Sequence, residues 1–211
     1  MKLKTIYLKN FRCYKDEVRI EFDDLTTFVG KNDIGKSTIL EALEIFFNND
    51  LVKIEPSDAN IHGDNNVVIT CDFCDLPSEL ILDSGEITNL ADEYLTISND
   101  TLRIKKVYDC SKSKVPSTVY IVANHPNVVE AKDLLSLKEK ELQKIIKDKG
   151  IDGPLKGNPL MRKAIWASIE DLHLQVTEIE VSKAKEDGKE IWTKIDAYLP
   201  NYALFQSDRS S

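Results

Sequence analysis

Apolar and polar residues alternate in two short runs near the start of the chain. In Thr5–Leu8 and Val18–Phe22 roughly every second residue is apolar, which is typical of strands with one face in a core. Leu25–Val29 predicts a third short strand. Because short links join these three segments, the pattern favours an antiparallel start to a sheet.

A helical pattern follows directly after a glycine-bearing loop. From about Lys36 to Phe47 the apolar residues recur at helical spacing on one face, and Asn48-Asn49-Asp50 ends the segment. Residues 51–66 contain Pro56, Gly63 and several Asn and Asp residues, so this segment predicts a loop.

The remaining pattern divides into a strand-rich part and a helix-rich part. Further strands are predicted at Val67–Phe73, Tyr94–Ile97, Thr101–Tyr108 and Thr118–Val122, with Ser98-Asn99-Asp100 as a hairpin link. Helices are predicted over Glu130–Lys149, around Met161–Leu172 and over Lys185–Tyr198, before a last strand at Tyr202–Phe205. We therefore expect an α/β fold with a mixed sheet, its N-terminal portion antiparallel, and a helical C-terminal segment. We expect the chain to divide into a nucleotide-binding lobe over residues 1–128 and a mainly helical segment over residues 129–211.

Composition indicates an ordinary soluble globular protein. Apolar residues make up 42% and charged residues 30% of the chain. No stretch approaches the ~18 uninterrupted apolar residues of a membrane helix, and no apolar signal core follows Met1. Cys71 and Cys74 have the spacing of a metal-binding pair, but their apolar surroundings favour core cysteines. These features predict a reduced, cytoplasmic protein. The net charge of −8 gives no compositional argument for nucleic-acid binding.

The loop Gly30-Lys31-Asn32-Asp33-Ile34-Gly35-Lys36-Ser37 matches the P-loop pattern G-x-x-x-x-G-K-[ST] at every fixed position. Glycines allow consecutive N–H groups to point at phosphate oxygens, and the following helix adds the positive end of its dipole. Lys36 is expected to reach the β- and γ-phosphates of ATP, Ser37 to ligate Mg²⁺, and Thr38 to lie near the α-phosphate. The expected ligands are therefore ATP and Mg²⁺.

Two sequence elements together resemble a known group of ATPases. Tyr7-Leu8-Lys9-Asn10-Phe11-Arg12, followed by the P-loop, is similar to the opening of SMC-like and RecF-like ATPases of the ABC type. The Asn-Asp-x-Gly-Lys-Ser variant and Leu40–Phe47 are most similar to the ATPase part of the OLD family, many of whose members carry a Toprim nuclease domain or act in anti-phage defence. The similarity is strongest in residues 1–50.

This resemblance implies a P-loop NTPase fold of the ABC/SMC-like type that forms a homodimer around ATP and is linked to DNA processing. It also implies that Arg12 approaches the nucleotide phosphates and that Asn32 helps to hold the γ-phosphate region. Asp33 stands where this group commonly has glycine, which affects the geometry of the loop.

The water-activating half of such an ATPase site is missing from the sequence. No aliphatic run ends in Asp-Glu or Glu-Glu, so a Walker B strand is absent, and no Ser-Gly-Gly signature occurs. We therefore expect a fragment of a longer ATPase that grips phosphates and hydrolyses ATP poorly by itself, with its catalytic residues unknown. A stand-alone P-loop kinase for a small molecule, or an interaction module that binds nucleotide without turnover, are the alternatives.

Other polar residues give weaker signals. Asp58 and His62 could approach the nucleotide, and Gln143 could contact Mg²⁺, although its Lys/Glu-rich surroundings favour a solvated helix face. The three histidines are scattered, without the spacing of metal ligands.

Overall fold

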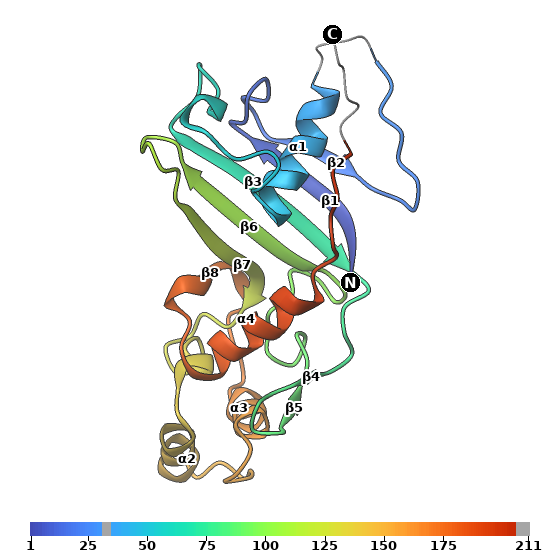
Figure 1. Ribbon diagram of the computed structural model, residues 1–211. Helices are drawn as coiled ribbons and strands as arrows, with labels where there is room; N and C mark the ends of the chain where they lie inside the picture. The colour runs from blue at the N-terminus through green and yellow to red at the C-terminus, as the bar shows by residue number, and fades with distance from the viewer. Residues whose placement is uncertain (31–34, 206–211) are drawn as a thin grey trace. The chain divides into compact units, whose positions relative to one another are not determined.

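The computed structural model describes residues 1–30 and 35–205 (Figure 1). The strands are β1 Lys2–Lys9, β2 Val18–Glu21, β3 Asn66–Cys74, β4 Leu80–Ile81, β5 Ile87–Thr88, β6 Leu102–Asp109, β7 Ser117–His125 and β8 Gln175–Glu180. The helices are α1 Lys36–Phe47, α2 Glu139–Asp148, α3 Asn158–Ala167 and α4 Glu186–Tyr198, with 3₁₀ turns at Pro56–Asp58, Leu134–Ser136 and Val181–Lys183. Six strands form one sheet in the order β2-β1-β3-β6-β7-β8, and β4 pairs with β5. None of the helices described is long and apolar enough to cross a membrane.

The antiparallel start of the sheet is confirmed. β1 pairs with β2 in antiparallel register, with Thr5 opposite Glu21 and Leu8 opposite Val18. The third predicted strand is wrong, because Leu25–Val29 belongs to no strand and its ends are 86% and 89% exposed. An apolar run becomes a strand only where a neighbouring strand completes its ladder of hydrogen bonds, and Leu25–Val29 has no such neighbour among the described residues.

The chain falls into two compact units that interleave along the sequence. One, here called the P-loop unit, comprises Leu3–Asp72, Lys105–Val119 and the segment from Pro200. The other, here called the helical unit, comprises Met1–Lys2, Phe73–Ile104 and Tyr120–Leu199. The sequence pattern suggested a single division after residue 128, and that division into domains stays a prediction.

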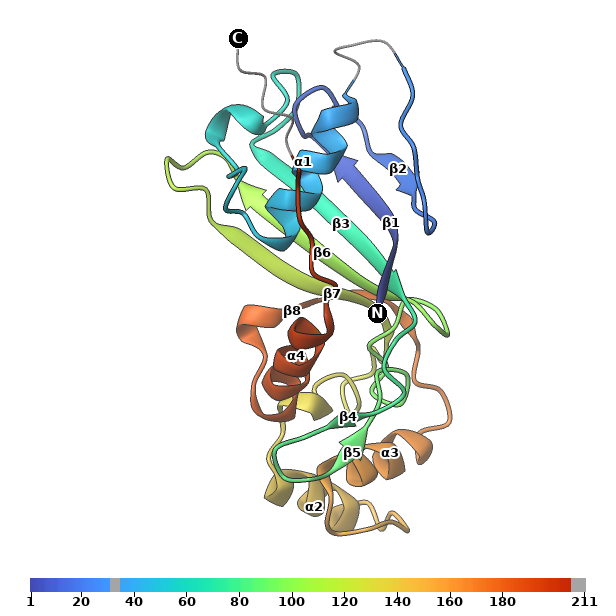
Figure 2. The ribbon, with the colours of Figure 1, turned by 45° about the vertical axis from the view of Figure 1, so that its right-hand side comes forward.

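Helix α1 forms the core of the P-loop unit. Its buried residues include Ile39, Ala42, Leu43 and Phe46, the face that the helical spacing predicted. Figures 1 and 2 both place α1 across one face of the sheet, beside β3 and β6. From β6, Tyr108 Oη donates to the Ile45 carbonyl at 3.2 Å and Lys106 Nζ donates to the Phe46 carbonyl at 2.7 Å. These contacts fix the C-terminal half of α1, so its N-terminus has a defined place.

The helical unit has its own apolar core. Its fully buried members come from α2, α3 and the segment before α2: Ala131, Leu134, Leu142, Ile146, Met161, Ile165 and Trp166. The expected helix over Glu130–Lys149 forms only from Glu139, because the segment before it turns to bury Ala131 and Leu134. The Glu141 carboxylate then accepts a hydrogen bond from the Lys138 N–H at 2.8 Å, which marks the start of α2.

Besides Leu25–Val29, two further predicted strands do not form, and three observed strands, β4, β5 and β8, were not predicted. Tyr94–Ile97 and Tyr202–Phe205 form no strand. By contrast β8 was not expected, yet it pairs antiparallel with β7 from Gln175 opposite His125 to Glu180 opposite Tyr120. Short runs of this kind adopt strand structure where tertiary contacts provide a partner, and local propensity alone does not decide them.

Candidate nucleotide-binding site

The N-terminus of α1 has the features of an anion-binding site. The helix begins at Lys36, and the preceding Gly35 has φ 89° and ψ 6°, a left-handed conformation that favours glycine. Among the described residues no side chain caps this end, and the first turn carries no acidic residue. The first N–H groups of a helix lack partners within it, and they lie at the positive end of its dipole. This end of α1 is therefore suited to bind phosphate.

Gly35 is packed closely by the turn that follows β1. Tyr14 Oη donates to the Gly35 carbonyl oxygen at 3.2 Å. A Cβ atom added at Gly35 would lie 2.6 Å from Tyr14 Oη and 3.0 Å from Cys13 Sγ. Both backbone conformation and space therefore require glycine at this position.

The residues of the P-loop motif lie as follows. Lys36 Nζ donates to the Gly30 carbonyl oxygen at 2.8 Å, so the lysine side chain reaches back to the first residue of the motif. Ser37 is exposed on the first turn of α1, and Thr38 is buried. The other expected phosphate contacts, Lys31, Asn32, Asp33 and Ile34, lie outside the described residues.

Arg12 is held by two carboxylates beside α1. Its Nε donates to Asp58 Oδ1 at 2.7 Å, and one terminal nitrogen pairs with the Glu41 carboxylate on α1. Burial lowers the pKa of Arg12, but the hydrogen bonds and charges of Glu41 and Asp58 outweigh this and raise it above its usual value. The structure thus brings Arg12 to the P-loop helix, where carboxylates neutralise it.

The turn that carries Arg12 is itself held by the Asp58 backbone and the Asn60 side chain. Arg12 has φ 50°, and its N–H donates to the Asp58 carbonyl at 2.7 Å. Asn60 Nδ2 donates to the Arg12 carbonyl at 2.5 Å. Sequence reasoning missed Glu41 and Tyr14. It offered Asp58 only as a weak candidate for a nucleotide contact, whereas in the structure Asp58 pairs with Arg12. No local signal distinguishes Glu41, because the same helix carries a second glutamate, Glu44.

Gln143 and His62 are two of the weaker candidates for contacts with the nucleotide or Mg²⁺. Gln143 Nε2 donates to Glu139 Oε1 at 2.9 Å and to the Leu155 carbonyl at 2.8 Å, so it stabilises its own helix and the following loop. His62 is exposed. Neither arrangement forms a ligand set for a metal.

The donor groups fit a Mg²⁺ ion that is carried by a nucleotide rather than one held by the protein alone. Among the residues that the structure describes, no group of three His, Cys, Asp or Glu side chains could hold a metal ion. Cys71 is buried in β3, which raises the pKa of its thiol and favours the neutral form. The exposed Ser37 hydroxyl can provide one oxygen ligand, and phosphate oxygens and water would supply the others.

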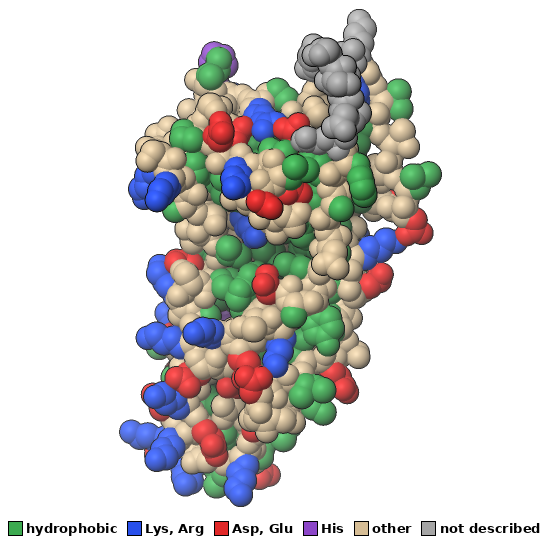
Figure 3. All heavy atoms as spheres, viewed as in Figure 1, with side chains coloured by type: hydrophobic (Ala, Val, Ile, Leu, Met, Phe, Trp, Pro, Cys, Tyr) green, Lys and Arg blue, Asp and Glu red, His purple; other side chains and the backbone are tan. Residues whose placement is uncertain are grey.

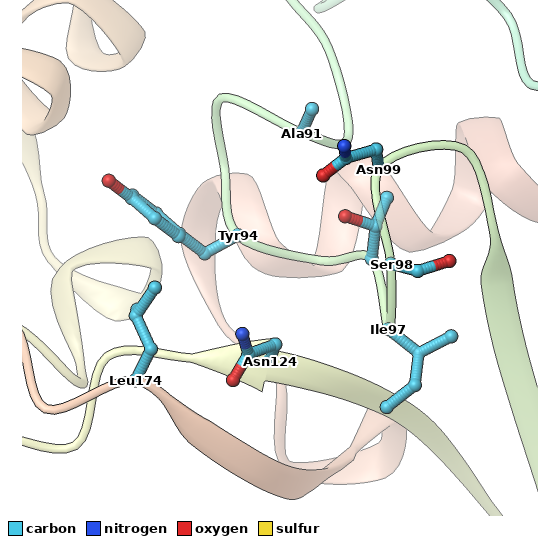
Figure 4. A pocket seen from close by; sticks show the side chains of 8 residues that line it. Ala91, Tyr94, Ile97, Ser98, Asn99, Asn124 and Leu174 are labelled. Carbon is cyan, nitrogen blue, oxygen red and sulfur yellow. The ribbon is translucent and has the colours of Figure 1, made fainter.

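A separate pocket lies in the helical unit. It has a volume of about 370 Å³ and is lined by Ala91, Tyr94, Thr96, Ile97, Ser98, Asn99, Asn124 and Leu174 (Figure 4). None of these side chains carries a charge, so the pocket offers no counter-charge to a phosphate. This pocket therefore differs from the start of α1, where Lys36 provides a positive charge.

Comparisons with known proteins show which proteins this chain is similar to. The chain is 48% identical over 44 residues to the chromosome partition protein Smc of Halobacteriovorax marinus, covering 20% of this chain and 4% of the relative. It is 52% identical over 44 residues to the DNA replication and repair protein RecF of Lactococcus lactis, covering 20% and 12%. It is 34% identical over 118 residues to the structural maintenance of chromosomes protein 3 homolog of Plasmodium falciparum, covering 54% and 9%.

These alignments cover only a small part of each relative, between 4% and 12% of its length. They support an ATPase of the SMC/RecF-like type. A family model for the AAA ATPase domain matches residues 1–211. The P-loop, the uncapped start of α1 and this match over the whole sequence lead to one conclusion: the chain belongs to the AAA ATPase domain family.

Proposed function

We propose that this chain binds ATP with Mg²⁺ at the N-terminus of α1 and provides the phosphate-binding half of an SMC/RecF-like ATPase head. The observation that carries the proposal is the start of α1. There a left-handed Gly35 leads into an uncapped helix end, directly followed by Lys36 and an exposed Ser37. Together these groups provide N–H donors, an ammonium and a hydroxyl at one helix end.

Binding of phosphate would exchange partners at Lys36. The ammonium that donates to the Gly30 carbonyl would turn to the β- and γ-phosphates, a stronger acceptor because the phosphate is charged. Ser37 would hold the Mg²⁺ that the nucleotide brings, and this ion would neutralise charge between the phosphates. Arg12 would reach the phosphates only by leaving Glu41, Asp58 or both.

Activation of the attacking water requires groups from another segment. The sequence carries no Walker B run, so an acidic residue would come from a further part of the protein or from a partner. A homodimer that closes around ATP would bring such parts together, as the resemblance to SMC-like and OLD-family ATPases implies. DNA processing, including a role in anti-phage defence, would then be driven by this closure.

A DNA contact would need a basic surface that composition does not supply. The relatives named for chromosome partition and for DNA replication and repair favour DNA as the partner. On the face shown in Figure 3, however, lysine and arginine side chains are interspersed with acidic ones. We therefore expect DNA to bind mainly through other parts of the full protein.

The kinase alternative has less support. A small-molecule kinase needs arginines on a lid that can reach the transferred phosphate. Arg162 is fully buried and pairs with Glu93 and Asp187, so it cannot serve in this way. Arg209 lies outside the described residues. A module that binds nucleotide without turnover stays as the second alternative, and the measurement below separates it from an ATPase.

The proposal is tested by titrating the protein with ATP in the presence of Mg²⁺ and in the presence of EDTA. We expect binding with Mg²⁺ that weakens markedly in EDTA, because Ser37 then has no ion to hold. An absence of ATP binding under both conditions would contradict the proposal. Phosphate release, measured together with sedimentation velocity, then separates an ATP-dependent dimer with turnover from a module that only binds.

A further inference from the structure

We propose that Tyr14 is a positioning residue that sets the orientation of the peptide between Gly35 and Lys36 for binding of a polyphosphate. This inference rests on the proposed nucleotide site and assigns a role there to a residue outside the P-loop motif. It starts from the hydrogen bond of 3.2 Å between Tyr14 Oη and the Gly35 carbonyl oxygen.

The Gly35 carbonyl accepts two long hydrogen bonds. Besides the one from Tyr14, it accepts the first α-helical bond from the Ile39 N–H at 3.3 Å. A carbonyl oxygen has two lone pairs and can accept both bonds. Tyr14 therefore adds a second restraint to a peptide that the helix alone holds weakly.

Because the peptide bond is planar, a restraint on the Gly35 carbonyl also restrains the direction of the Lys36 N–H. In a trans peptide the C=O of Gly35 and the N–H of Lys36 point in opposite directions. Holding the carbonyl towards Ile39 and Tyr14 therefore directs the Lys36 N–H away from the helix body. This N–H is one of the donors without a helical partner that make the site attractive to anions.

Backbone hydrogen bonds hold Tyr14 in the turn that follows β1. Phe11 and Tyr14 exchange backbone hydrogen bonds of 2.9 Å and 2.8 Å, which closes a tight turn. Arg12 within this turn has φ 50° and is tied to Asp58, as described above. Tyr14 thus reaches Gly35 from a turn that is closed by backbone hydrogen bonds.

The ring and the hydroxyl of Tyr14 have separable effects. A Cβ atom added at Gly35 would lie 3.0 Å from the ring atom Cζ of Tyr14. The ring therefore leaves space only for glycine at this position. Burial raises the pKa of Tyr14, with a smaller effect from Cys13, so the hydroxyl stays a donor at neutral pH. Tyr14→Phe keeps the ring and removes only the donor.

The test compares the wild-type protein with Tyr14→Phe and with the control Tyr198→Phe, which alters an exposed tyrosine at the end of α4. The measured quantities are the Kd values for ATP–Mg²⁺ and for inorganic pyrophosphate, the melting temperature without ligand, and the ¹⁵N amide resonance of Lys36. We expect Tyr14→Phe to raise both Kd values by about twofold to tenfold, as loss of one hydrogen bond does. The Lys36 amide should shift without ligand, while the melting temperature and the control stay close to wild type.

The outcomes separate this inference from the proposed function. If the wild-type protein binds neither ATP nor pyrophosphate, the nucleotide site itself is wrong and the role of Tyr14 falls with it. If the wild-type protein binds both and Tyr14→Phe binds equally well with an unchanged Lys36 amide, only the positioning role is wrong. A lower melting temperature with an unchanged Kd would also overturn it, since Tyr14 would then serve stability alone.

Discussion

Lys36 Nζ donates to the Gly30 carbonyl oxygen at 2.8 Å, so the lysine of the P-loop motif is bonded to the first residue of its own loop. This contact places the ammonium beside the first residue of the motif. Nucleotide binding would replace the neutral Gly30 carbonyl by a charged phosphate as the acceptor of the Lys36 ammonium. A substitution of Lys36 would remove this hydrogen bond to the phosphate.

Replacing Lys36 by alanine should abolish most ATP binding. Hydrogen bonds to charged groups contribute about 1.5–3 kcal/mol, so the Kd should rise by about tenfold to a hundredfold. Calorimetric titration with ATP–Mg²⁺ measures this, with Lys53→Ala as a control on an exposed lysine that pairs only weakly with Asp50. Unchanged affinity in Lys36→Ala would remove the basis of the P-loop assignment.

Gly35→Ala should be more harmful than Gly85→Ala. Both glycines have left-handed φ values, 89° and 82°, but a Cβ at Gly85 would meet nothing within 4 Å. The strain of a left-handed residue, about 1 kcal/mol, therefore applies to both. Only Gly35→Ala adds the clash with Tyr14 and Cys13. Urea denaturation and ATP titration should show the larger stability loss, and the loss of binding, in Gly35→Ala alone.

Glu41→Gln tests whether Arg12 changes partners. Removing this negative charge loosens Arg12 from α1 while Asp58 still holds it. If Arg12 contacts the phosphates, the Kd for ATP should fall several-fold in Glu41→Gln and rise in Arg12→Gln. Equal affinities in both variants and in wild type would place Arg12 in a purely structural role.

Arg162 should be essential for the stability of the helical unit. It is fully buried, donates to both oxygens of the 1% exposed Glu93 at 2.6 Å and 2.8 Å, and pairs with Asp187 at 2.5 Å. Removing one partner of a buried ion pair costs about 3–5 kcal/mol, because the other charge stays buried without compensation. Arg162→Ala should therefore unfold at much lower urea concentration.

The neighbouring Lys163→Ala is the matched control for that experiment. Lys163 lies on the same helix, is mostly exposed and pairs with Asp92 at 3.1 Å. A surface pair of this kind contributes about 0–1 kcal/mol. Similar losses of stability in the two variants would contradict the role given to the buried pair.

Tyr202 should make stability depend on pH above pH 10. Its ring stacks on Phe47 at 5.7 Å, and its hydroxyl donates to the Leu40 carbonyl at 2.8 Å. Burial, followed by the charge of Glu44, raises the pKa of Tyr202 to about 12. The unfolded chain loses this proton at lower pH, so the stabilising effect is complete below pH 10 and is lost as pH rises towards 12.

The comparison of wild type with Tyr202→Phe isolates this effect. Tyr108 and Tyr14 also have raised pKa values, and they contribute equally to both proteins. The difference in free energy of unfolding between the two proteins should therefore shrink between pH 10 and pH 12. A constant difference over this range would show that the Tyr202 hydroxyl is not held against α1.

Much of the fold and the motif could be predicted from local sequence. The helical spacing of Ile39, Leu43 and Phe46 predicted the bounds and buried face of α1, because one apolar face of a helix is defined within a few turns. The pattern also predicted the β1–β2 pairing and α4 closely. By itself, then, the sequence determined the P-loop, the helix behind it and the antiparallel start of the sheet.

Only the tertiary structure decided which elements and residues meet. Leu25–Val29 has the composition of a strand but finds no pairing neighbour in the part of the chain that the structure describes, whereas Gln175–Glu180 becomes a strand beside β7. Likewise Arg12, Glu41 and Asp58 are up to 46 residues apart in the chain, and no local pattern joins them. Strand pairing and ion pairs depend on distances between remote segments, which local periodicity does not contain. The hydrogen bond between Tyr14 and Gly35 is a further example, because it forms only when folding brings the turn after β1 to the start of α1.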